Sequence, residues 1–476
     1  MAISARLTFP FLTLLVSYKS LKKIMLKQIK SYIDNKIPED SPIRLLYHRF
    51  KAMLAALIYF FPSNNFNVIA VTGTKGKSTS CSLITAILEE AGKKVAMSTS
   101  INLQIGNEKW VNTSKMTTMS PFALQKFFKT AYQAGCEYVV LEVSSHAVTQ
   151  SRVWGVNFDT VALTHIEKDH LEYHGSLEEY VSAKEKLFKN LNGLNRKPNI
   201  SKVMVLNEDD SYFERFNEHH ADLKMTYGLN RGTVHPKNIQ LNADKSSFVL
   251  SIPNNQIDVT WSLMGTFNIA NALLAAAVGI ANGINLTIIK SALKKVEPIP
   301  GRLERIEVGQ PYTVIVDYAH TTDSLTKLCS LYKPLTKGKL ILIFGCTGGG
   351  RDKAKRPLMG EVADQFADLI ILTNDDPYDE EEMNIINDIA VGIKRKEGEG
   401  LWKIVSRKEA VHLALMMAKT GDTVILTGKG CEEVQIIRGE RVPWDDRRVV
   451  HDFLSRTIEI EIDTGEMVRG NACLEG

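Results

Sequence analysis

Residues 71–80 read VTGTKGKSTS, and this stretch decides the fold. The apolar run VIAVTG, which ends at Gly73, is typical of a buried strand, and residues 78–91 carry a helical pattern that ends at Gly92. Between them, glycines let backbone N–H groups close around a phosphate, the helix N-terminus favours the anion, and Ser78 can ligate Mg²⁺. An ordinary strand-to-helix turn is the alternative. The combination of strand, GKS and helix favours a phosphate-binding loop.

The bulk composition narrows the class of protein. A length of 476 residues predicts two or three domains, and 44% hydrophobic with 24% charged residues is typical of a globular protein. The formal net charge of +4 gives no case for nucleic-acid binding. The 6 cysteines contain no CxxC pair, which argues against a zinc site or disulfide framework and indicates a reducing compartment. We therefore expect a cytoplasmic protein.

The segment before residue 67 is apolar, and we predict that it is largely helical. MAISARLTFPFLTLLVSY superficially resembles a signal peptide, but it lacks a small-residue cleavage site and Pro10 interrupts it. Met25 is an alternative start. The apolar run at residues 53–61 has about half the length that spans a bilayer, so we interpret it as a buried helix that packs on the next domain. No stable membrane span is expected.

From residue 67 onward, short apolar strands alternate with helical stretches, which predicts α/β layers. Short β-like segments replace this pattern between residues 223 and 264, and VEPIPGRLERI near residue 300 has the prolines and glycine of a linker. The alternation then restarts with YTVIVDYA, KLILIFGC, ADLIILTN and DTVILTGKG. Polar clusters follow several strands, where open α/β sheets bind their ligands. We expect three parts, at residues 1–66, 67–299 and 300–476.

The phosphate loop departs from the common GxxxxGK pattern, because Val71 stands where that pattern needs glycine. Its shorter form, TGTxGK[ST], is similar to the loop of the Mur ligase family, and most closely the chain resembles the MurE type of that family. Eight further segments resemble family motifs in the same order: EVSSHAVTQSRV (142–153), LTHIEKDHLEYHG (163–175), EEYVSAKEKLF (178–188), GTFNIANALLAA (265–276), PGRLERI (300–306), DYAHTTDSL (317–325), FGCTGGGRDKAKRP (344–357) and GKGCEEVQ (428–435). The resemblance implies a central P-loop-type ATPase domain with a mostly parallel sheet, a C-terminal Rossmann-like α/β domain and a short helical N-terminal region.

The resemblance also implies a reaction. Such ligases use ATP to convert a carboxylate of a UDP-muramoyl-dipeptide into an acyl phosphate, which the amine of a free amino acid then attacks. Positive charge is needed where the γ-phosphate meets the carboxylate, and Lys77 with Mg²⁺ on Ser78 would supply it. The positions that match the family's ATP site are Gly73, Thr74, Gly76, Lys77, Ser78, Thr79, Asn271, Arg302, Asp317 and His320. A monomer is expected.

The metal ligands that the resemblance implies are Ser78, Glu142, His170 and Lys184, and the catalytic residues are Lys77, His170 and Lys184. In the family the lysine at the position of Lys184 is carbamylated by CO₂, which turns a cation into a carboxylate-like ligand for a second Mg²⁺. That reaction needs an unprotonated amine and hence a lowered pKa. Read without the family, Lys184 is an exposed helix lysine that pairs with Glu179 or Glu185.

The stretch TNDDPYDEEE (373–382) aligns with the loop by which MurE-type enzymes select their amino acid. The diaminopimelate form of that loop reads DNPR, but here Tyr378 stands at the arginine position and Asp376 replaces the asparagine. Losing a cation and gaining an anion favours a side chain that ends in an ammonium, so we predict L-lysine or a similar diamine over meso-diaminopimelate. The acids at 379–382 are expected to begin a helix.

Other substrate contacts carry over by motif position. Those that match the muramoyl-peptide site are Thr117, Thr118, Ser144, Gln150 and Arg152, and those that match the amino-acid pocket are Arg351, Asp375, Asp376, Tyr378, Gly428 and Glu432.

Two alternative functions remain. One is a Mur-like ligase for a lipid-linked, polymeric or folate-like acceptor, suggested by the short region before residue 67, and the other is a non-ligase P-loop NTPase, which has no use for DYAHTTDSL and GKGCE.

Overall fold

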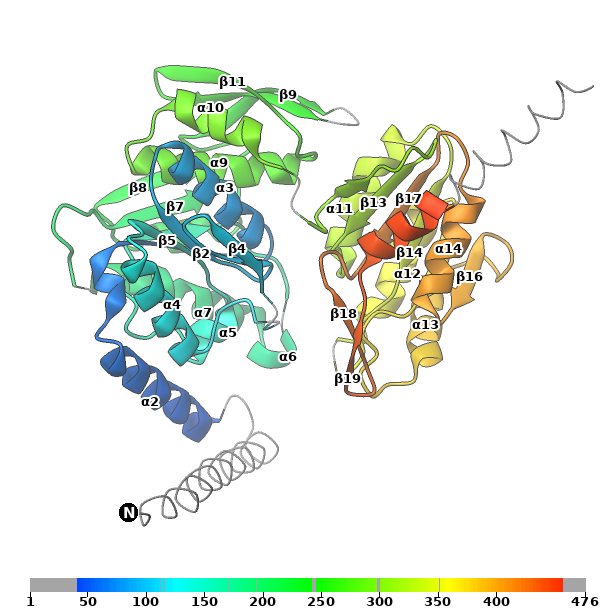
Figure 1. The fold of residues 1–476 in the computed structure, drawn as a ribbon, viewed down its shortest axis with the longest axis horizontal. Helices are drawn as coiled ribbons and strands as arrows, with labels where there is room; N and C mark the ends of the chain where they lie inside the picture. The colour runs from blue at the N-terminus through cyan, green and yellow to red at the C-terminus, as the bar shows by residue number, and fades with distance from the viewer. Residues whose placement is uncertain are drawn as a thin grey trace, which may run out of the picture. The chain divides into compact units, whose positions relative to one another are not determined.

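The computed structural model describes residues 41–456, except for 113, 115, 170, 194, 242–244, 298–299 and 351. By the density of their internal contacts these residues form two compact units. One contains the residues up to 75 together with 94–204 and 214–223, and the other contains 76–93, 205–213 and the residues from 224 on. The alternation of strands and helices confirms the predicted α/β class (Figure 1).

An eight-stranded sheet carries the phosphate loop. Its strands are β1 (Asn67–Thr72), β2 (Val95–Ser98), β3 (Asn102–Ile105), β4 (Glu108–Val111), β5 (Tyr138–Glu142), β6 (Thr160–Leu163), β7 (Val203–Asn207) and β8 (Leu223–Tyr227), in the order β4-β3-β2-β5-β1-β6-β7-β8. β1 pairs in parallel with β5 and β6, with Val71 opposite Glu142 and Thr72 opposite Leu163. Because these strands end together, the chain segments that follow β1, β5 and β6 meet at one edge of the sheet.

The helices between these strands are α3 (Lys77–Glu90), α4 (Pro121–Gln133), α5 (Ser145–Thr149), α6 (Leu171–His174), α7 (Leu177–Lys189) and α8 (Phe213–Asn217), with the 3₁₀ turn η2 (Leu191–Gly193). The predicted β-like region contains β9 (His235–Leu241), β10 (Ser246–Ile252) and β11 (Asn255–Trp261), which form an antiparallel sheet. α9 (Thr266–Ala281) and α10 (Leu286–Lys295) follow and pack against α3. The alanine-rich face of α9 allows this close approach, since residues 272–278 are buried.

The C-terminal sheet has the strand order β12-β13-β17-β14-β15-β16. Its strands are β12 (Glu304–Ile306), β13 (Thr313–Asp317), β14 (Leu340–Phe344), β15 (Leu369–Thr373), β16 (Leu401–Ile404) and β17 (Thr423–Thr427), parallel except for β12. The remaining elements are α11 (Thr322–Tyr332), η3 (Lys333–Leu335), α12 (Lys355–Phe366), α13 (Glu382–Ala390), α14 (Arg407–Met417) and the hairpin of β18 (Val434–Ile437) and β19 (Glu440–Pro443).

Alternating side chains of the C-terminal strands build a core on each face of this sheet. Leu340, Leu342 and Phe344 pack with residues of α11, α12 and α13, whereas Ile341 and Ile343 pack with residues of α14. Both sets are fully buried, so the strands read as continuous apolar runs, as parallel strands covered on both faces do. The layered arrangement leaves the strand ends as the place for polar residues.

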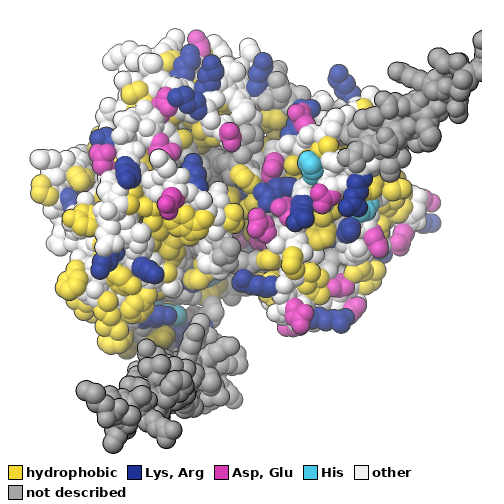
Figure 2. Space-filling view, in the orientation of Figure 1, with side chains coloured by type: hydrophobic (Ala, Val, Ile, Leu, Met, Phe, Trp, Pro, Cys, Tyr) yellow, Lys and Arg dark blue, Asp and Glu magenta, His cyan; other side chains and the backbone are white. Residues whose placement is uncertain are grey.

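The apolar run at residues 53–61 lies in and after α2 (Pro42–Ile58), which precedes the turn η1 (Pro62–Asn65). The expectation that this helix is buried is wrong for one of its faces. The small residues Ala52, Ala55 and Ala56 are buried and α2 packs against α4, but the larger Phe50 and Leu57 are 63% and 56% exposed. Figure 2 shows hydrophobic side chains gathered over this helix. In the part of the chain that the structure describes, no helix is long and apolar enough to cross a membrane.

Candidate active site

The loop between β1 and α3 is shaped by two glycines. Gly73 and Gly76 have φ angles of 142° and 79°, and a Cβ atom would lie 1.8 Å from Oγ1 of Thr164 at the first and 2.3 Å from Oδ1 of Asn271 at the second. The backbone N–H of Thr74 donates to the carbonyl of His165, at 2.7 Å. The loop is therefore held by its surroundings in a conformation that only glycine adopts easily.

The first residues of α3 are Lys77, Ser78 and Thr79, which match the predicted phosphate site. Ser78 and Thr79 are buried, Lys77 is half-buried, and the first turn of α3 contains no acidic residue. The first backbone N–H groups of a helix have no partner within the helix and carry partial positive charge. The helix start, the ammonium group and the glycine loop together can bind a polyphosphate.

Lys184 projects from α7 toward this loop. It is 1% exposed, its Nζ donates to the carbonyl oxygen of Gly73 at 2.8 Å, and it lies 4.4 Å from the centroid of the Tyr180 ring. The hydroxyl of Tyr180 bonds Oγ1 of Thr74 at 3.0 Å, and burial raises the pKa of this phenol. The alternative of an exposed lysine is therefore wrong. Of the two partners that this alternative named, Glu179 and Glu185, the second bonds Arg215 instead.

Among the predicted Mg²⁺ ligands, Glu142 lies at the end of β5 and is 2% exposed. Its carboxylate accepts hydrogen bonds from the backbone N–H and the hydroxyl of Ser100, at 2.8 and 3.1 Å. The carboxylate and the hydroxyl of Ser78 are hard oxygen donors of the kind that Mg²⁺ prefers, so the donor chemistry fits this ion. His170 lies outside the described residues. Within those residues, no group of three or more His, Cys, Asp or Glu could hold a metal by itself.

Four of the five residues predicted to hold the acceptor are joined by hydrogen bonds. Oγ1 of Thr118 donates to the carbonyl of Glu142 at 3.0 Å and accepts from the N–H of Ser144 at 3.1 Å. The guanidinium of Arg152 donates to the carbonyl of Thr118 and to Oε1 of Gln150. This arrangement lies at the end of β5, where Ser144 is two residues after Glu142. The fifth residue, Thr117, is half-buried.

The residues predicted for the nucleotide lie in two places. Asn271, on α9, contacts the loop side of α3, where its Oδ1 accepts from the hydroxyl of Ser80 at 3.3 Å. The other three gather at the end of β13. The guanidinium of Arg302 lies 4.5 Å from the Tyr318 ring centroid, and Nδ1 of His320 bonds the Tyr318 carbonyl at 2.8 Å. Burial raises the pKa of the Asp317 carboxyl, which accepts from two backbone N–H groups.

The predicted amino-acid pocket contains a cation that sequence reasoning missed. Lys429 is fully buried, and its Nζ lies 2.8 Å from Asp376, 2.6 Å from Glu432 and 3.7 Å from Asp375. Burial works to lower the pKa of Lys429, but the three carboxylates outweigh it and the pKa is raised. Burial also raises the pKa of Asp375, and Gly428 adjoins that carboxylate. The lysine of the GKGCE motif is the sequence signal that could have indicated this cation, but only the fold shows which carboxylates it pairs with.

The other residues predicted for the amino-acid pocket include Tyr378 and Arg351. Tyr378 adopts a left-handed backbone conformation, with φ of 55°, and its ring lies against Gly349, where a Cβ would come within 2.7 Å of it. Arg351 lies outside the described residues. The acids at 379–382 do begin a helix, because α13 starts at Glu382. Glu380, however, bonds the buried Arg356, and this pairing lowers the pKa of Glu380 to about 2.

A glycine phosphate loop on a mixed, mostly parallel sheet, together with a Rossmann-like α/β region, is the architecture expected of an ATP-dependent ligase. Profiles of the Mur ligase middle domain and of the Mur ligase glutamate ligase domain match residues 71–279 and 301–430. The diaminopimelate-adding UDP-N-acetylmuramoyl-L-alanyl-D-glutamate ligase of Geobacillus kaustophilus is 38% identical over 415 residues, which are 86% of this chain and 83% of that protein. The ligase of the same name from Bacillus cereus is 37% identical over 428 residues, 89% and 86% of the two chains. The chain therefore belongs to the Mur ligase family, and its relatives place it with the MurE type.

Solved structures agree with this assignment. A solved structure of a UDP-N-acetylmuramoyl-L-alanyl-D-glutamate–2,6-diaminopimelate ligase has a TM-score of 0.58 and 30% identity, and the match covers 82% of this chain and 79% of that one. The folylpolyglutamate synthase of Mycobacterium tuberculosis, solved with ADP and AMPPCP, has a TM-score of 0.63 at 16% identity, covers 85% and 95% of the two chains, and shares the fold. Membership in this family excludes the non-ligase NTPase.

Proposed function

We propose that this enzyme adds a free diamino acid, L-lysine, to the muramoyl dipeptide UDP-N-acetylmuramoyl-L-Ala-D-Glu in peptidoglycan precursor synthesis. ATP would transfer its γ-phosphate to a carboxylate of the acceptor, releasing ADP, and the amine would then displace phosphate to form the amide. The observation that carries the proposal is the phosphate loop with Lys77 and Ser78 on it and Glu142 at the end of the strand paired with β1. The ligases named for this acceptor in the relatives support it.

We further propose that this chain's residues hold ATP with Mg²⁺, and that the metal neutralises phosphate charge when bound. Ser78, Glu142, His170 and carbamylated Lys184 would hold it, and Lys77 would attract the polyphosphate. The burial of Lys184 supports carbamylation, since an amine out of water loses its proton more easily. In that step the neutral Nζ adds to CO₂ and releases a proton, so a cation becomes an anion. The hydrogen bond from Nζ to Gly73 keeps the group beside the phosphate loop.

The choice of L-lysine rests on the amino-acid pocket. Tyr378 replaces the arginine that would pair with the additional carboxylate of diaminopimelate. Asp376 is weaker evidence for a cationic substrate than its place in the sequence suggests, because its carboxylate is already paired with the ammonium group of Lys429. Asp375, Asp376 and Glu432 still outnumber Lys429, so an ammonium group is favoured over a second carboxylate. The relatives are named as diaminopimelate ligases, which is the argument for diaminopimelate as the added amino acid.

An assay of ADP release identifies the substrates. Purified enzyme with ATP and Mg²⁺ is given UDP-muramoyl-dipeptide and, in separate reactions, L-lysine, L-ornithine, meso-diaminopimelate or no amino acid. Release that requires both the acceptor and lysine supports the proposal, and a preference for diaminopimelate overturns the amino-acid assignment. Turnover only with a folate-like, polymeric or lipid-linked acceptor favours the second candidate.

The proposed organisation follows the expected boundaries of 1–66, 67–299 and 300–476. The two family matches, at 71–279 and 301–430, fall within the second and third parts and support these limits. We also propose that the enzyme acts as a cytoplasmic monomer, as its substrates would require only a dissolved nucleotide precursor and a free amino acid. Size-exclusion chromatography with light scattering measures its oligomeric state.

A further inference from the structure

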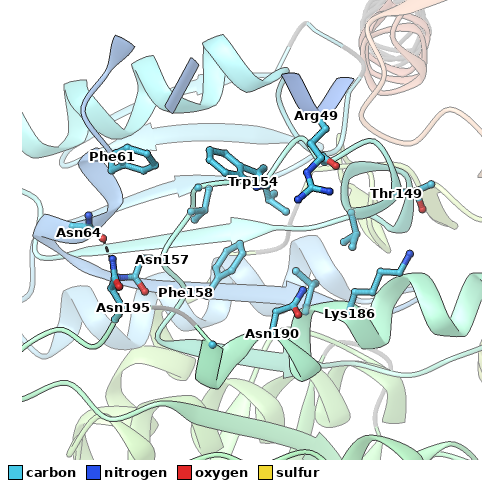
Figure 3. Close-up of a pocket in the computed structure, with 17 residues that line it drawn as sticks. Arg49, Phe61, Asn64, Thr149, Trp154, Asn157, Phe158, Lys186, Asn190 and Asn195 are labelled. Atoms are coloured by element: carbon cyan, nitrogen blue, oxygen red, sulfur yellow. Dashed lines mark hydrogen bonds between the residues drawn. The ribbon is translucent and has the colours of Figure 1, made fainter. Parts of the chain in front are cut away.

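A cavity of 730 Å³ lies between α2, the segment after α5, and α7 (Figure 3). Its lining comes from residues of α2, η1, α5 and α7, from the segment 151–158 and from positions around η2. None of the residues predicted from the sequence for ATP, metal or substrate lines it. Its volume falls within the roughly 300–1,000 Å³ of small-molecule sites. The cavity therefore has no role in the ligation site predicted from the sequence.

The charges that line the cavity have one sign. Arg49 from α2 and Lys186 from α7 are its basic residues, and its 17 lining residues include no aspartate or glutamate. Figure 3 shows the side chain of Arg49 in the upper part of the view and that of Lys186 below it, with Trp154 and Phe158 to their left. Neither side-chain cation has a hydrogen bond or ion pair with the residues that the structure describes. By contrast, Arg215 of α8 is paired with Glu185 of α7. Two such cations that face a shared hollow attract an anion, and a diphosphate has oxygens enough to accept hydrogen bonds from both.

The floor of the cavity is aromatic. Trp154 is half-buried and lies 6.3 Å from Phe61, ring to ring, while Phe158 is 4% exposed. A flat ring bound here would bury apolar area against these side chains. A purely anionic ligand would make no use of this surface. The lining thus favours a ligand with a charged part and a flat, weakly polar part.

Amide groups complete the lining. Asn157 is fixed, since its Nδ2 donates to Oδ1 of Asn64 and to the carbonyl of Asn195, both at 2.9 Å. By contrast, the side-chain amides of Asn190 and Asn195 have no hydrogen bond with the described residues. An amide offers a donor and an acceptor side by side, which complements the carbonyl and N–H edge of a pyrimidine base. An isoprenoid chain in the same place would leave these groups without hydrogen-bond partners.

We propose that this cavity binds the nucleoside diphosphate end of the acceptor, with the diphosphate between Arg49 and Lys186 and the base on Trp154. The inference rests on the proposed function, because that function supplies an acceptor with a uridine diphosphate group. It assigns to α2, α7 and the segment between residues 148 and 158 the task of holding the far end of the acceptor.

The double variant Arg49→Ala/Lys186→Ala tests this assignment in the full-length enzyme. We expect the KM for UDP-muramoyl-dipeptide to rise about tenfold or more, because two charge-assisted contacts are lost. The kcat and the KM for ATP should stay within about twofold. Lys189→Ala removes an exposed lysine from the same helix outside the cavity and is the matched control, and Arg49→Lys should restore part of the binding. An acceptor without the uridine diphosphate group should be used equally by wild type and variant.

A calorimetric titration shows which kind of diphosphate the cavity binds. It also tests binding in the cavity independently of the proposed ligase reaction. UDP, inorganic pyrophosphate and farnesyl diphosphate are each titrated into the wild type and the double variant, with a non-hydrolysable ATP analogue filling the phosphate loop. Binding of UDP that the variant loses supports the inference, even if the muramoyl dipeptide proves not to be the acceptor. Farnesyl diphosphate binding without UDP binding overturns it, and so does a KM for UDP-muramoyl-dipeptide that is unchanged in the double variant, provided that the enzyme turns this acceptor over.

Discussion

Replacing Lys429 by methionine tests the electrostatics of the amino-acid pocket. The substitution keeps a long unbranched side chain but removes the cation whose Nζ lies 2.6 Å from Glu432, 2.8 Å from Asp376 and 3.7 Å from Asp375. Asp375 and Asp376 are buried, at 4% and 7% exposure. The variant therefore leaves buried carboxylates without this partner.

Removing one partner of a buried ion pair costs about 3–5 kcal/mol, because the remaining charge stays out of water. We expect the free energy of unfolding at pH 7 to fall by about this amount. Burial already raises the folded-state pKa of Asp375 above its unfolded value near 4, and without the ammonium of Lys429 this pKa rises further. A raised folded-state pKa means that the folded protein gains stability as the pH falls, so the deficit should shrink by about 1–2 kcal/mol between pH 7 and pH 5.

Urea unfolding of the wild type and Lys429→Met at pH 7 and pH 5 measures both effects. The matched control is Lys327→Met, because Lys327 pairs with Asp323 at 3.0 Å while both side chains are 45% exposed. An exposed pair contributes less than about 1 kcal/mol, and this difference should not depend on pH in the same way. A loss below about 1 kcal/mol at pH 7 for Lys429→Met, or a deficit that stays constant down to pH 5, refutes the electrostatic reasoning.

Three further predictions address the phosphate loop, the carbamate and acid stability. Gly76→Ala should raise the KM for ATP at least about tenfold, since its Cβ would lie 2.3 Å from Oδ1 of Asn271, whereas Gly92→Ala, with a similar φ of 77° and open space around it, should leave that KM unchanged. Lys184→Ala should abolish ADP release, and added short carboxylates should restore part of that release. Full activity of Lys184→Arg would contradict the carbamate proposal. The pKa of Glu380 is lowered from 4.5 to about 2, so its ion pairs stabilise the fold above pH 4.5 and this contribution disappears as the pH falls through 2. Glu380→Gln should therefore lose about 1–3 kcal/mol at pH 7 and converge with the wild type near pH 2 in denaturant titrations; a loss that is the same at both pH values contradicts this.

The sequence predicted those parts of the site that lie within a few residues of each other. The strand, the two glycines and the start of α3 follow directly along the chain, so local rules for strands, turns and helix starts identify them. The positions of Glu142 and Thr164 at strand ends could also be expected, because parallel strands end at a common edge. The alternation of apolar strands and helices was sufficient for the α/β class.

The pairing of Lys429 could not be predicted in this way. It is 53 residues from Asp376 and follows β17, which lies between β13 and β14 in the sheet. In that strand order β14 alone separates β17 from β15, so the segments that follow these two parallel strands lie close together at the same edge of the sheet. Counting charges at Asp376 alone therefore overstated the negative character of the pocket. For α2, composition showed an apolar helix but not that its alanines would pack on α4 while larger side chains stayed exposed.

The two lysines of α7 connect the proposed reacting end and the proposed far end of the acceptor. Lys184 and Lys186 are two positions apart, so their side chains leave the helix about 200° from each other. Lys184 bonds the carbonyl of Gly73 in the phosphate loop, and Lys186 lines the cavity on the other side. A nucleoside diphosphate joined to a sugar and a dipeptide is longer than the roughly 10 Å diameter of a helix, so such an acceptor can reach both faces. An acceptor that ends at the sugar would reach only the loop, which is why the KM measured with and without the uridine diphosphate group separates binding at Lys186 from chemistry at Lys184.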